Sequence, residues 1–254
     1  MSPLRDGLLF GATALAGAVN AVAGGGTLLS FPAALAWGLP SPVANATNAL
    51  AMSPGALASA WAYRRELATR RSLAALLSAP TIVGAVIGAA LMRRTPERTF
   101  DAIVPVLVFG ATLALLLQGL ASRRAEQTRA PSRRRIAAAT AAQLLVGVYG
   151  GYFGAAMGIV MLALLSLLPG DIHGRIAVKN VLSAVANGVA AVYFVISGLV
   201  DPHAALIMVP AAIVGGYAGG HIARRASPRA VRVLVVGIGL AVSALLAYRA
   251  FVRA

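Results

Sequence analysis

The chain has 254 residues, of which 59% are hydrophobic and only 11% are charged, and its mean hydropathy is +0.82. A soluble domain carries roughly 25% charged residues, so this composition excludes a soluble globular protein and predicts an all-α integral membrane protein. The net charge of +15 does not predict a nucleic-acid partner, because the arginines lie in short clusters between apolar segments without interleaved aromatic residues. The chain has no cysteine, which excludes disulfides and thiolate zinc sites.

Charged residues, proline and glycine divide the chain into ten apolar segments. In chain order these are 7–23, 27–37, 45–62, 72–92, 100–120, 136–153, 157–168, 177–196, 204–222 and 230–248. A membrane-spanning helix needs roughly 20 residues, so 27–37 and 157–168 are predicted to be half-helices. A basic linker at 122–135, expected to be cytoplasmic, separates a first transmembrane repeat (1–121) from a second one (136–254).

The two halves resemble each other along their length, with offsets of 130 to 132 residues. A constant offset over many positions indicates a tandem duplication. The matching pairs are Gly17 with Gly147, Gly24 with Gly154, Asn48 with Asn180, Trp61 with Tyr193, Pro80 with Pro210, and Gly84 with Gly215.

The number of crossings in each half decides whether the repeats are parallel or inverted. If 7–37 crosses once, each half has four crossings, the repeats are parallel, and the 22 Lys and Arg residues divide 13 to 9. If 7–37 turns and returns to the same face, each half has three full crossings, the repeats are inverted, and the division is 16 to 6. Positive charge gathers on the cytoplasmic side, which favours inverted repeats, each with a glycine-broken hairpin and about three full transmembrane helices.

The stretch AVNAVAGGGTLLSFPAAL, residues 18–35, places three glycines inside the first apolar segment. Segment 7–37 would measure about 46 Å as one continuous helix, which suits a hairpin that turns near the membrane midplane. Gly24, Gly25 and Gly26 can form such a turn, because glycine adopts positive φ without steric cost. Non-helical backbone at membrane depth is tolerated where it is buried in protein or lines a wet cavity.

A helix that starts at Thr27 would direct free N–H groups and its positive dipole end towards the midplane, which predicts an anion site. The second half repeats the interruption in GGYFGAAMG, residues 150–158. Paired interrupted segments in corresponding positions are typical of a transporter binding site. The alternative is that the glycines only allow close helix packing, and we prefer it for Gly84/Gly88, Gly215/Gly219 and Gly216/Gly220.

Several polar residues lie within the apolar segments. Helix capping is the expected role of Asn45, and it is the alternative to a substrate-binding role for Asn48. Lys179 is an ionisable residue inside a predicted membrane segment, which is a functional-site hypothesis by default. The alternative for Lys179 is an interfacial lysine that extends its amine to the headgroups. Asn180 follows it directly, and Asn187 lies two turns further on the same helix face.

The sequence contains no recognisable catalytic constellation. Most of its seven acidic residues fall in loops or at segment ends, so no carboxylate pair or proton relay is evident. The triple glycine is not followed by the Gly-Lys-Ser/Thr of a nucleotide-binding loop. With three histidines and no carboxylate cluster, we predict no metal, no cofactor and no enzymatic activity.

Two stretches carry a family resemblance. AGAVNAVAGGGTLLSFPAALAWGLPSPVANATNALA in the first half and GVYGGYFGAAMGIVMLALLSLLPGDIHGRIAVKNVLSAVANGVAAVYFVISGLVD in the second resemble the sulfite exporter TauE/SafE family. The resemblance runs over nearly the whole chain, and its most specific parts are the glycine run followed by Phe-Pro and the Lys179-Asn180 segment. One departure is Ala155-Ala156, where the family often has more glycine.

The resemblance implies a multi-pass carrier, in a bacterial inner membrane, that exports small sulfur-containing anions such as sulfite, sulfoacetate or other organosulfonates. We expect alternating access around a midplane site between the repeats, where backbone N–H groups, asparagine amides and Lys179 hold the anion. The expected substrate-binding residues are Asn20, Gly24, Gly25, Gly26, Thr27, Asn48, Gly154, Ala156, Lys179, Asn180 and Asn187.

The sequence also leads to expectations about binding partners, and it leaves the oligomeric state and two alternative functions open. The expected partners are the anion and the lipid bilayer, without nucleic acid, and a homo-oligomer is left open. The alternatives are a non-transporting membrane scaffold or accessory subunit and a transporter of a different small solute. A scaffold would leave the paired helix breaks unexplained.

Overall fold

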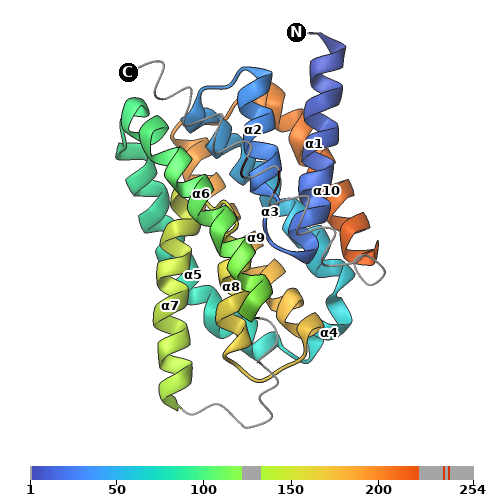
Figure 1. Cartoon of the computed structure of the whole chain (residues 1–254), viewed down its shortest axis with the longest axis vertical. Helices are drawn as coiled ribbons and strands as arrows, with labels where there is room; N and C mark the ends of the chain where they lie inside the picture. The colour runs from blue at the N-terminus through green and yellow to red at the C-terminus, as the bar shows by residue number, and fades with distance from the viewer. Residues whose placement is uncertain (1, 122–132, 223–236, 238–239, 241–254) are drawn as a thin grey trace.

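The computed structural model describes residues 2–121, 133–222, 237 and 240 of the chain (Figure 1). This part of the chain is all-helical, as the composition predicts. Its helices are α1 (Pro3–Val22), α2 (Thr27–Trp37), α3 (Ser41–Ala62), α4 (Arg64–Ala68), α5 (Arg71–Arg94), α6 (Glu97–Ala121), α7 (Arg133–Tyr152), α8 (Met157–Ser166), α9 (Ile172–Ile196) and α10 (Pro202–Ile222).

The helices follow the predicted segments but several extend beyond them into polar residues. Helix α9 begins five residues before the predicted start because Asp171 caps it, accepting a 2.9 Å hydrogen bond from the Gly174 N–H. That hydrogen bond is the main reason why the pKa of Asp171 lies below its usual value. The short helix α4 was not predicted. Most of the predicted linker, 122–132, and nearly all of the last segment, 230–248, lie outside the described residues.

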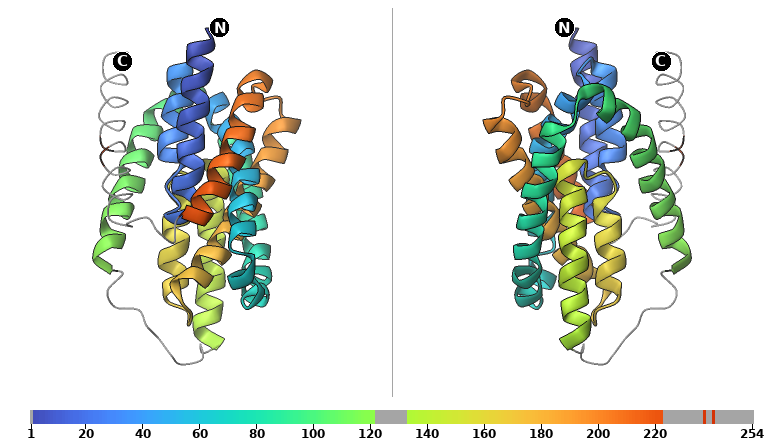
Figure 2. Two further views of the ribbon diagram at one scale, coloured as in Figure 1. Left: turned by 90° about the vertical axis from the view of Figure 1, so that its right-hand side faces the viewer. Right: turned by 90° about the vertical axis from the view of Figure 1, so that its left-hand side faces the viewer.

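The first broken segment is a hairpin that returns to the end where it started. The indole N–H of Trp37, at the end of α2, donates a 2.8 Å hydrogen bond to the Asp6 carboxylate in the first turn of α1. Figure 2 shows α1 and α2 together in the upper half of the molecule, and α7 and α8 together in the lower half. The breaks between the helices of each pair face each other at mid-height.

Three of the described helices are long and apolar enough to cross a membrane: α5, α9 and α10. Their outward faces carry exposed aliphatic side chains, among them Val83 at 53% and Leu206 at 76% exposure. Exposed apolar surface of this extent is stable against lipid and not against water. Together with the composition, this architecture is that of an integral membrane protein.

Glycines allow two helix pairs to approach until their backbones touch. A Cβ atom on Gly84 or Gly88 of α5 would lie 2.3 Å or 2.0 Å from carbonyl oxygens of α7. A Cβ atom on Gly215 of α10 would lie 1.8 Å from the Ala14 carbonyl oxygen of α1, and one on Gly219 would lie 2.4 Å from the Ala18 Cα. The close-packing interpretation of these glycines is therefore confirmed.

Candidate functional site

The two helix breaks meet in the middle of the molecule. A Cβ atom on Gly24 would lie 2.5 Å from the Gly158 Cα, and one on Gly158 would lie 2.6 Å from the Gly24 Cα. Gly24 has a φ of +85° and Gly154 a φ of +70°, conformations that favour glycine. Glycines with positive φ occur here because each of the two segments turns sharply at the point where its backbone touches the other segment.

Two helix N-termini are directed at this contact. Helix α2 begins at Thr27 and helix α8 at Met157, each just after its break. Within the described part of the chain, several backbone N–H groups around the breaks donate to no protein acceptor, whereas the Leu28 and Met157 amides that follow them donate to Gly25 and Gly154 carbonyls. The amides without an acceptor are those of Gly24, Gly25, Gly26, Thr27, Ala155, Ala156 and Gly158.

Lys179 lies beside both breaks. Its side chain is 0% exposed, and its ammonium group donates a hydrogen bond to the Asn20 carbonyl oxygen in the last turn of α1. A Cβ atom on Gly158 would lie 2.9 Å from the Lys179 Cδ, so the lysine stem runs along the start of α8. The alternative of an interfacial, headgroup-directed lysine is wrong, because α9 begins two turns earlier and buries Lys179 completely.

Asparagine side chains hold the first break from two helices. The Asn180 amide donates a 3.4 Å hydrogen bond to the Ala21 carbonyl at the end of α1. On α3, the Asn48 amide donates a 3.4 Å hydrogen bond to the Thr27 hydroxyl, and its oxygen accepts a 2.5 Å hydrogen bond from Ser30. Capping of α3 by Asn48 is therefore excluded, since its side chain contacts the first turn of α2 instead.

Asn45 and Tyr149, neither of which was predicted to bind substrate, hold the second break. The Asn45 amide donates a 3.0 Å hydrogen bond to the Tyr152 carbonyl at the end of α7. The capping role expected for Asn45 is wrong, because α3 starts at Ser41 and places Asn45 in its second turn. The Tyr149 hydroxyl donates a 2.6 Å hydrogen bond to the Ala155 carbonyl. Asn45 lies three residues before Asn48 on the same face of α3, and this spacing could have indicated that both side chains reach the helix breaks.

Asn187 and Ala156 also lie at the second break. The Asn187 amide donates to the Ser183 carbonyl of its own helix at 2.9 Å, which leaves its oxygen 3.8 Å from a Cβ position on Gly154. Ala156 precedes α8 in a left-handed conformation with a φ of +55°. An alanine in this conformation is strained, so the second break contains a constraint that the glycine-rich first break lacks.

The predicted site residues therefore lie in the two breaks and on the buried faces of α1, α2, α3 and α9 around them. The exposed fraction is at most 8% for the polar residues among them, Asn20, Thr27, Asn48, Lys179, Asn180 and Asn187. The side-chain amines and amides of Asn48, Lys179, Asn180 and Asn187 donate hydrogen bonds to protein oxygens, whereas several backbone N–H groups of both breaks have no acceptor among the described residues. Within the described residues, the Asn180 oxygen is a buried acceptor without a donor.

Phe31, Phe100, Tyr152 and Phe153 form an aromatic cluster at the second break. The Phe31 and Phe153 rings pack edge to face at 5.1 Å, and Phe100 packs against both Tyr152 at 5.9 Å and Phe153 at 6.1 Å. Phe31, Phe100 and Phe153 are at most 3% exposed. Because Tyr152 is the last residue of α7 and Phe153 follows it, the cluster lies directly beside the second break.

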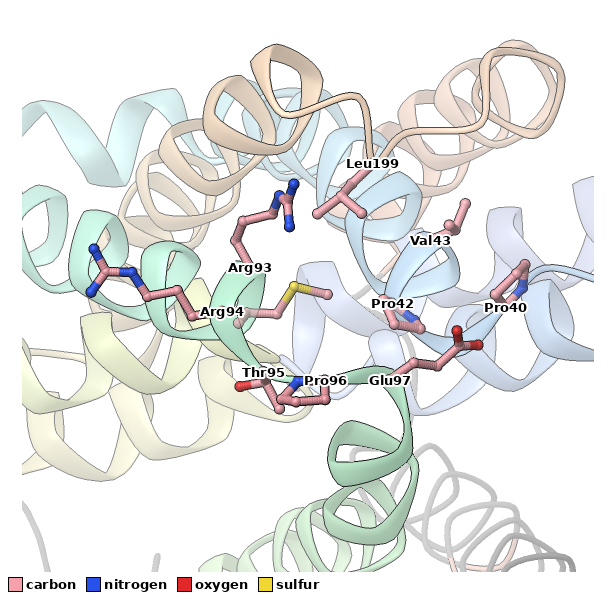
Figure 3. Close-up of a pocket in the computed structure, with 10 residues that line it drawn as sticks. Pro40, Pro42, Val43, Arg93, Arg94, Thr95, Pro96, Glu97 and Leu199 are labelled. Carbon is pink, nitrogen blue, oxygen red and sulfur yellow. The ribbon is translucent and has the colours of Figure 1, made fainter. Parts of the chain in front are cut away.

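A cavity of about 480 Å³ lies between the start of α3, the end of α5 and the start of α6 (Figure 3). Arg93 directs its guanidinium towards Leu199 in this view, whereas Arg94 points away from the cavity. The Tyr152 hydroxyl donates a 3.3 Å hydrogen bond to the Thr95 hydroxyl, which connects the cavity wall to the end of α7. The lining residues are Pro40, Pro42, Val43, Met92, Arg93, Arg94, Thr95, Pro96, Glu97 and Leu199.

Curated proteins of similar sequence are all named as membrane transporters. "Probable membrane transporter protein YfcA" of Escherichia coli (strain K12) is 29% identical over 249 residues, which are 98% of this chain and 91% of that protein. A "Probable membrane transporter protein" of Haemophilus influenzae is 24% identical over 242 residues, covering 95% of this chain and 94% of that protein. "Probable membrane transporter protein ORF9" of Sinorhizobium sp is 27% identical over 239 residues, covering 92% and 89%.

No solved structure matches this chain. The family model named Sulfite exporter TauE/SafE matches residues 9–246, which include both helix breaks and the Lys179-Asn180 segment. The relatives, the family match and the apolar helices agree on a multi-pass membrane protein. This chain belongs to the sulfite exporter TauE/SafE family, a family of membrane transporters.

Proposed function

We propose that this protein is a secondary transporter, in a bacterial inner membrane, of small sulfur-containing anions such as sulfite, sulfoacetate or other organosulfonates. The observation that carries the proposal is the meeting of two helix N-termini with free backbone N–H groups beside one buried lysine. N–H donors, positive dipole ends and an ammonium group attract an anion and offer little to a cation. The family match supports the sulfur-containing class of anion.

We propose that the anion binds between the two breaks, against the amides of Gly25, Gly26 and Ala156. Lys179 supplies the charge, and Asn48 and Asn180 exchange their long 3.4 Å protein hydrogen bonds for bonds to the anion. Binding requires a small separation of the breaks, because the Gly24 and Gly158 backbones touch in this structure. A site that opens by separation of two elements is suited to alternating access.

We further propose that the two halves are inverted repeats that rock against each other. The α1–α2 and α7–α8 hairpins enter from opposite ends, which supports this arrangement (Figure 2). Helix α5 packs on α7 and α10 packs on α1, so each half contributes a long helix that contacts the hairpin of the other. The glycines at these two contacts, Gly84 and Gly215, are repeat mates.

The charge distribution suggests which end faces the cytoplasm. Basic residues of α4, of the start of α7 and of the start of α9 lie at the lower end in Figure 1, where the positive-inside rule places the cytoplasm. The cavity beside Arg93 then opens to the outside. We propose that this cavity is the outer vestibule and that the aromatic cluster is the barrier between it and the anion site.

The test is a thermal-stability measurement of the purified protein in detergent with sulfite, sulfoacetate, taurine, sulfate and chloride. A ligand at a hundred times its Kd adds about 2.7 kcal/mol to the stability. We expect selective stabilisation by one sulfur-containing anion, lost in Lys179→Met and retained in Arg98→Gln, which changes an exposed charge on α6. The absence of a shift with every anion would contradict the proposed function.

A further inference from the structure

Lys179 is the one charged side chain that is buried within the described part of the chain. An ammonium group has three N–H donors, and the described structure provides one acceptor for it, the Asn20 carbonyl oxygen. An unpaired charge in a low-dielectric interior is costly. Lys179 is thus stable as a cation when a negative charge joins it, and as a neutral amine when none does.

Among the described residues, no carboxylate forms an ion pair with Lys179. Their acidic side chains lie at helix ends or connections, and the ion pair found among them joins Arg70 to Asp171 at 3.8 Å. Helices α3 and α8 carry no Asp, Glu, Lys, Arg or His. The titratable or charged groups of the other elements around Lys179 are Arg5 and Asp6 on α1, Arg64, Arg65 and Glu66 on α4, Arg71, Arg93 and Arg94 on α5, Arg133, Arg134, Arg135, Tyr149 and Tyr152 on α7, and His173, Arg175 and Tyr193 on α9.

One of these groups lies on the same helix as Lys179, one turn away, and another donates a hydrogen bond at the second break. Arg175 lies one helical turn before it and donates a 3.1 Å hydrogen bond to the Leu168 carbonyl, at the lower end of the molecule. The Tyr149 hydroxyl donates to the Ala155 carbonyl. Neither group is an anion, so the described residues provide no negative charge that compensates Lys179.

We propose that Lys179 binds a proton together with the substrate anion, so that transport of a monovalent anion is an electroneutral anion–proton symport. This inference rests on the proposed function, because it assigns a coupling ion to the same site. The protonated amine attracts the anion, and by linkage the bound anion retains the proton to the same degree. Ligands that strengthen each other's binding at one site travel together, which excludes exchange of an anion for a proton.

The proton step balances without a further reactant. When the site opens, the anion leaves, one N–H bond of the Lys179 ammonium breaks, the electron pair stays on nitrogen, and the proton passes to water on the same side. The site then returns without substrate, with a neutral amine that donates a hydrogen bond to the Asn20 carbonyl oxygen. An inward proton gradient therefore drives uptake, and efflux requires a higher anion concentration inside.

The binding half of the test uses methanesulfonate, whose charge is constant between pH 6 and 9, and sulfite as a second probe. Affinity is measured by thermal shift on the full chain in detergent at each pH. We expect the affinity of the wild type for methanesulfonate to fall up to tenfold per pH unit towards the alkaline end. In Lys179→Arg, which keeps its charge at every pH used, the affinity should be independent of pH.

The transport half uses the wild type in proteoliposomes with a pH-sensitive dye inside. A methanesulfonate gradient should move protons in the direction of the anion, at a ratio of one to one, and a potassium-diffusion potential should not change the initial rate. This measurement keeps the proposal testable when Lys179→Arg does not fold.

The outcomes separate this inference from the proposed function. The absence of stabilisation by both probes at pH 6 contradicts the proposed anion site itself. Binding with a flat pH profile in the wild type, or anion flux without proton movement, overturns the symport and leaves the anion transporter standing. A falling profile, with proton movement alongside the anion, supports both.

Discussion

The two helix breaks differ in composition, conformation and charge although they occupy corresponding positions. The first has three consecutive glycines and is held by Lys179 and Asn180 of the other half. The second has Gly154 followed by Ala155 and a left-handed Ala156, and is held by neutral hydrogen bonds. The stem of Lys179 runs along the second break, but its ammonium group donates its hydrogen bond at the first.

This difference implies a division of roles between the breaks. Glycine at the first break allows the chain to change its dihedral angles at little cost. Ala156 has a narrower range, and the Tyr149 hydroxyl fixes the preceding carbonyl at 2.6 Å. We expect the first break to adjust to the anion and the second to act as a fixed wall.

The largest effect is expected where the two breaks touch. Gly24→Ala would place a Cβ atom 2.5 Å from the Gly158 backbone at a φ of +85°. Steric overlap and left-handed strain together should cost about 2 to 5 kcal/mol, measured as a lower Tm in detergent. Gly11→Ala on α1 is the control, because nothing lies within 4 Å of its Cβ position. Equal Tm values for the two variants would contradict the contact between the breaks.

Removal of the positive charge of Lys179 should lower the affinity for the anion. Lys179→Met keeps most of the side-chain volume and is expected to weaken anion binding at least tenfold, or about 1.4 kcal/mol. Titration of Tm with the stabilising anion measures this loss. Arg98→Gln, at an exposed position, should retain the wild-type affinity. Unchanged affinity in Lys179→Met would exclude the lysine from the site.

Asn180 binds the end of α1 and Asn45 binds the end of α7, and their substitution should affect stability and anion affinity in opposite proportions. Asn45→Ala removes a 3.0 Å hydrogen bond and should cost about 1 to 3 kcal/mol of stability while anion affinity stays within about twofold. Asn180→Ala removes a 3.4 Å hydrogen bond, so we expect a smaller loss of stability and a larger loss of affinity. Thermal unfolding with and without anion separates the two quantities. Identical profiles would remove the asymmetry proposed for the breaks.

The smallest effect is expected at Ala156. Ala156→Gly relieves left-handed strain of about 1 to 2 kcal/mol, against about 0.5 to 1 kcal/mol for the greater freedom of the unfolded chain. A net stabilisation below about 1 kcal/mol should raise Tm slightly. Ala155→Gly is the matched control, because Ala155 has no positive φ and should lose stability. A lower Tm for Ala156→Gly would show that the methyl group contributes more by packing than it costs in strain.

Much of the site was accessible from the sequence because a few local rules apply strongly in a membrane. The glycine runs and the short apolar segments predicted both breaks and the half-helices α2 and α8 within two residues. Lys179 was identified because an ionisable residue in a membrane segment is rare. Asn45 and Tyr149 were not assigned to the break, since their partners lie 107 and six residues away and depend on how the chain turns.

The sequence by itself determined the membrane class, the helical segments and the positions of both breaks, because hydropathy, helix length and glycine content act locally. Only the tertiary structure decided that the breaks touch and that Lys179 is fully buried against the end of α1. The tertiary structure also showed that Asn180 binds the end of α1 and Asn45 binds the end of α7. These contacts join residues more than a hundred positions apart, and the packing of several helices at once selects them.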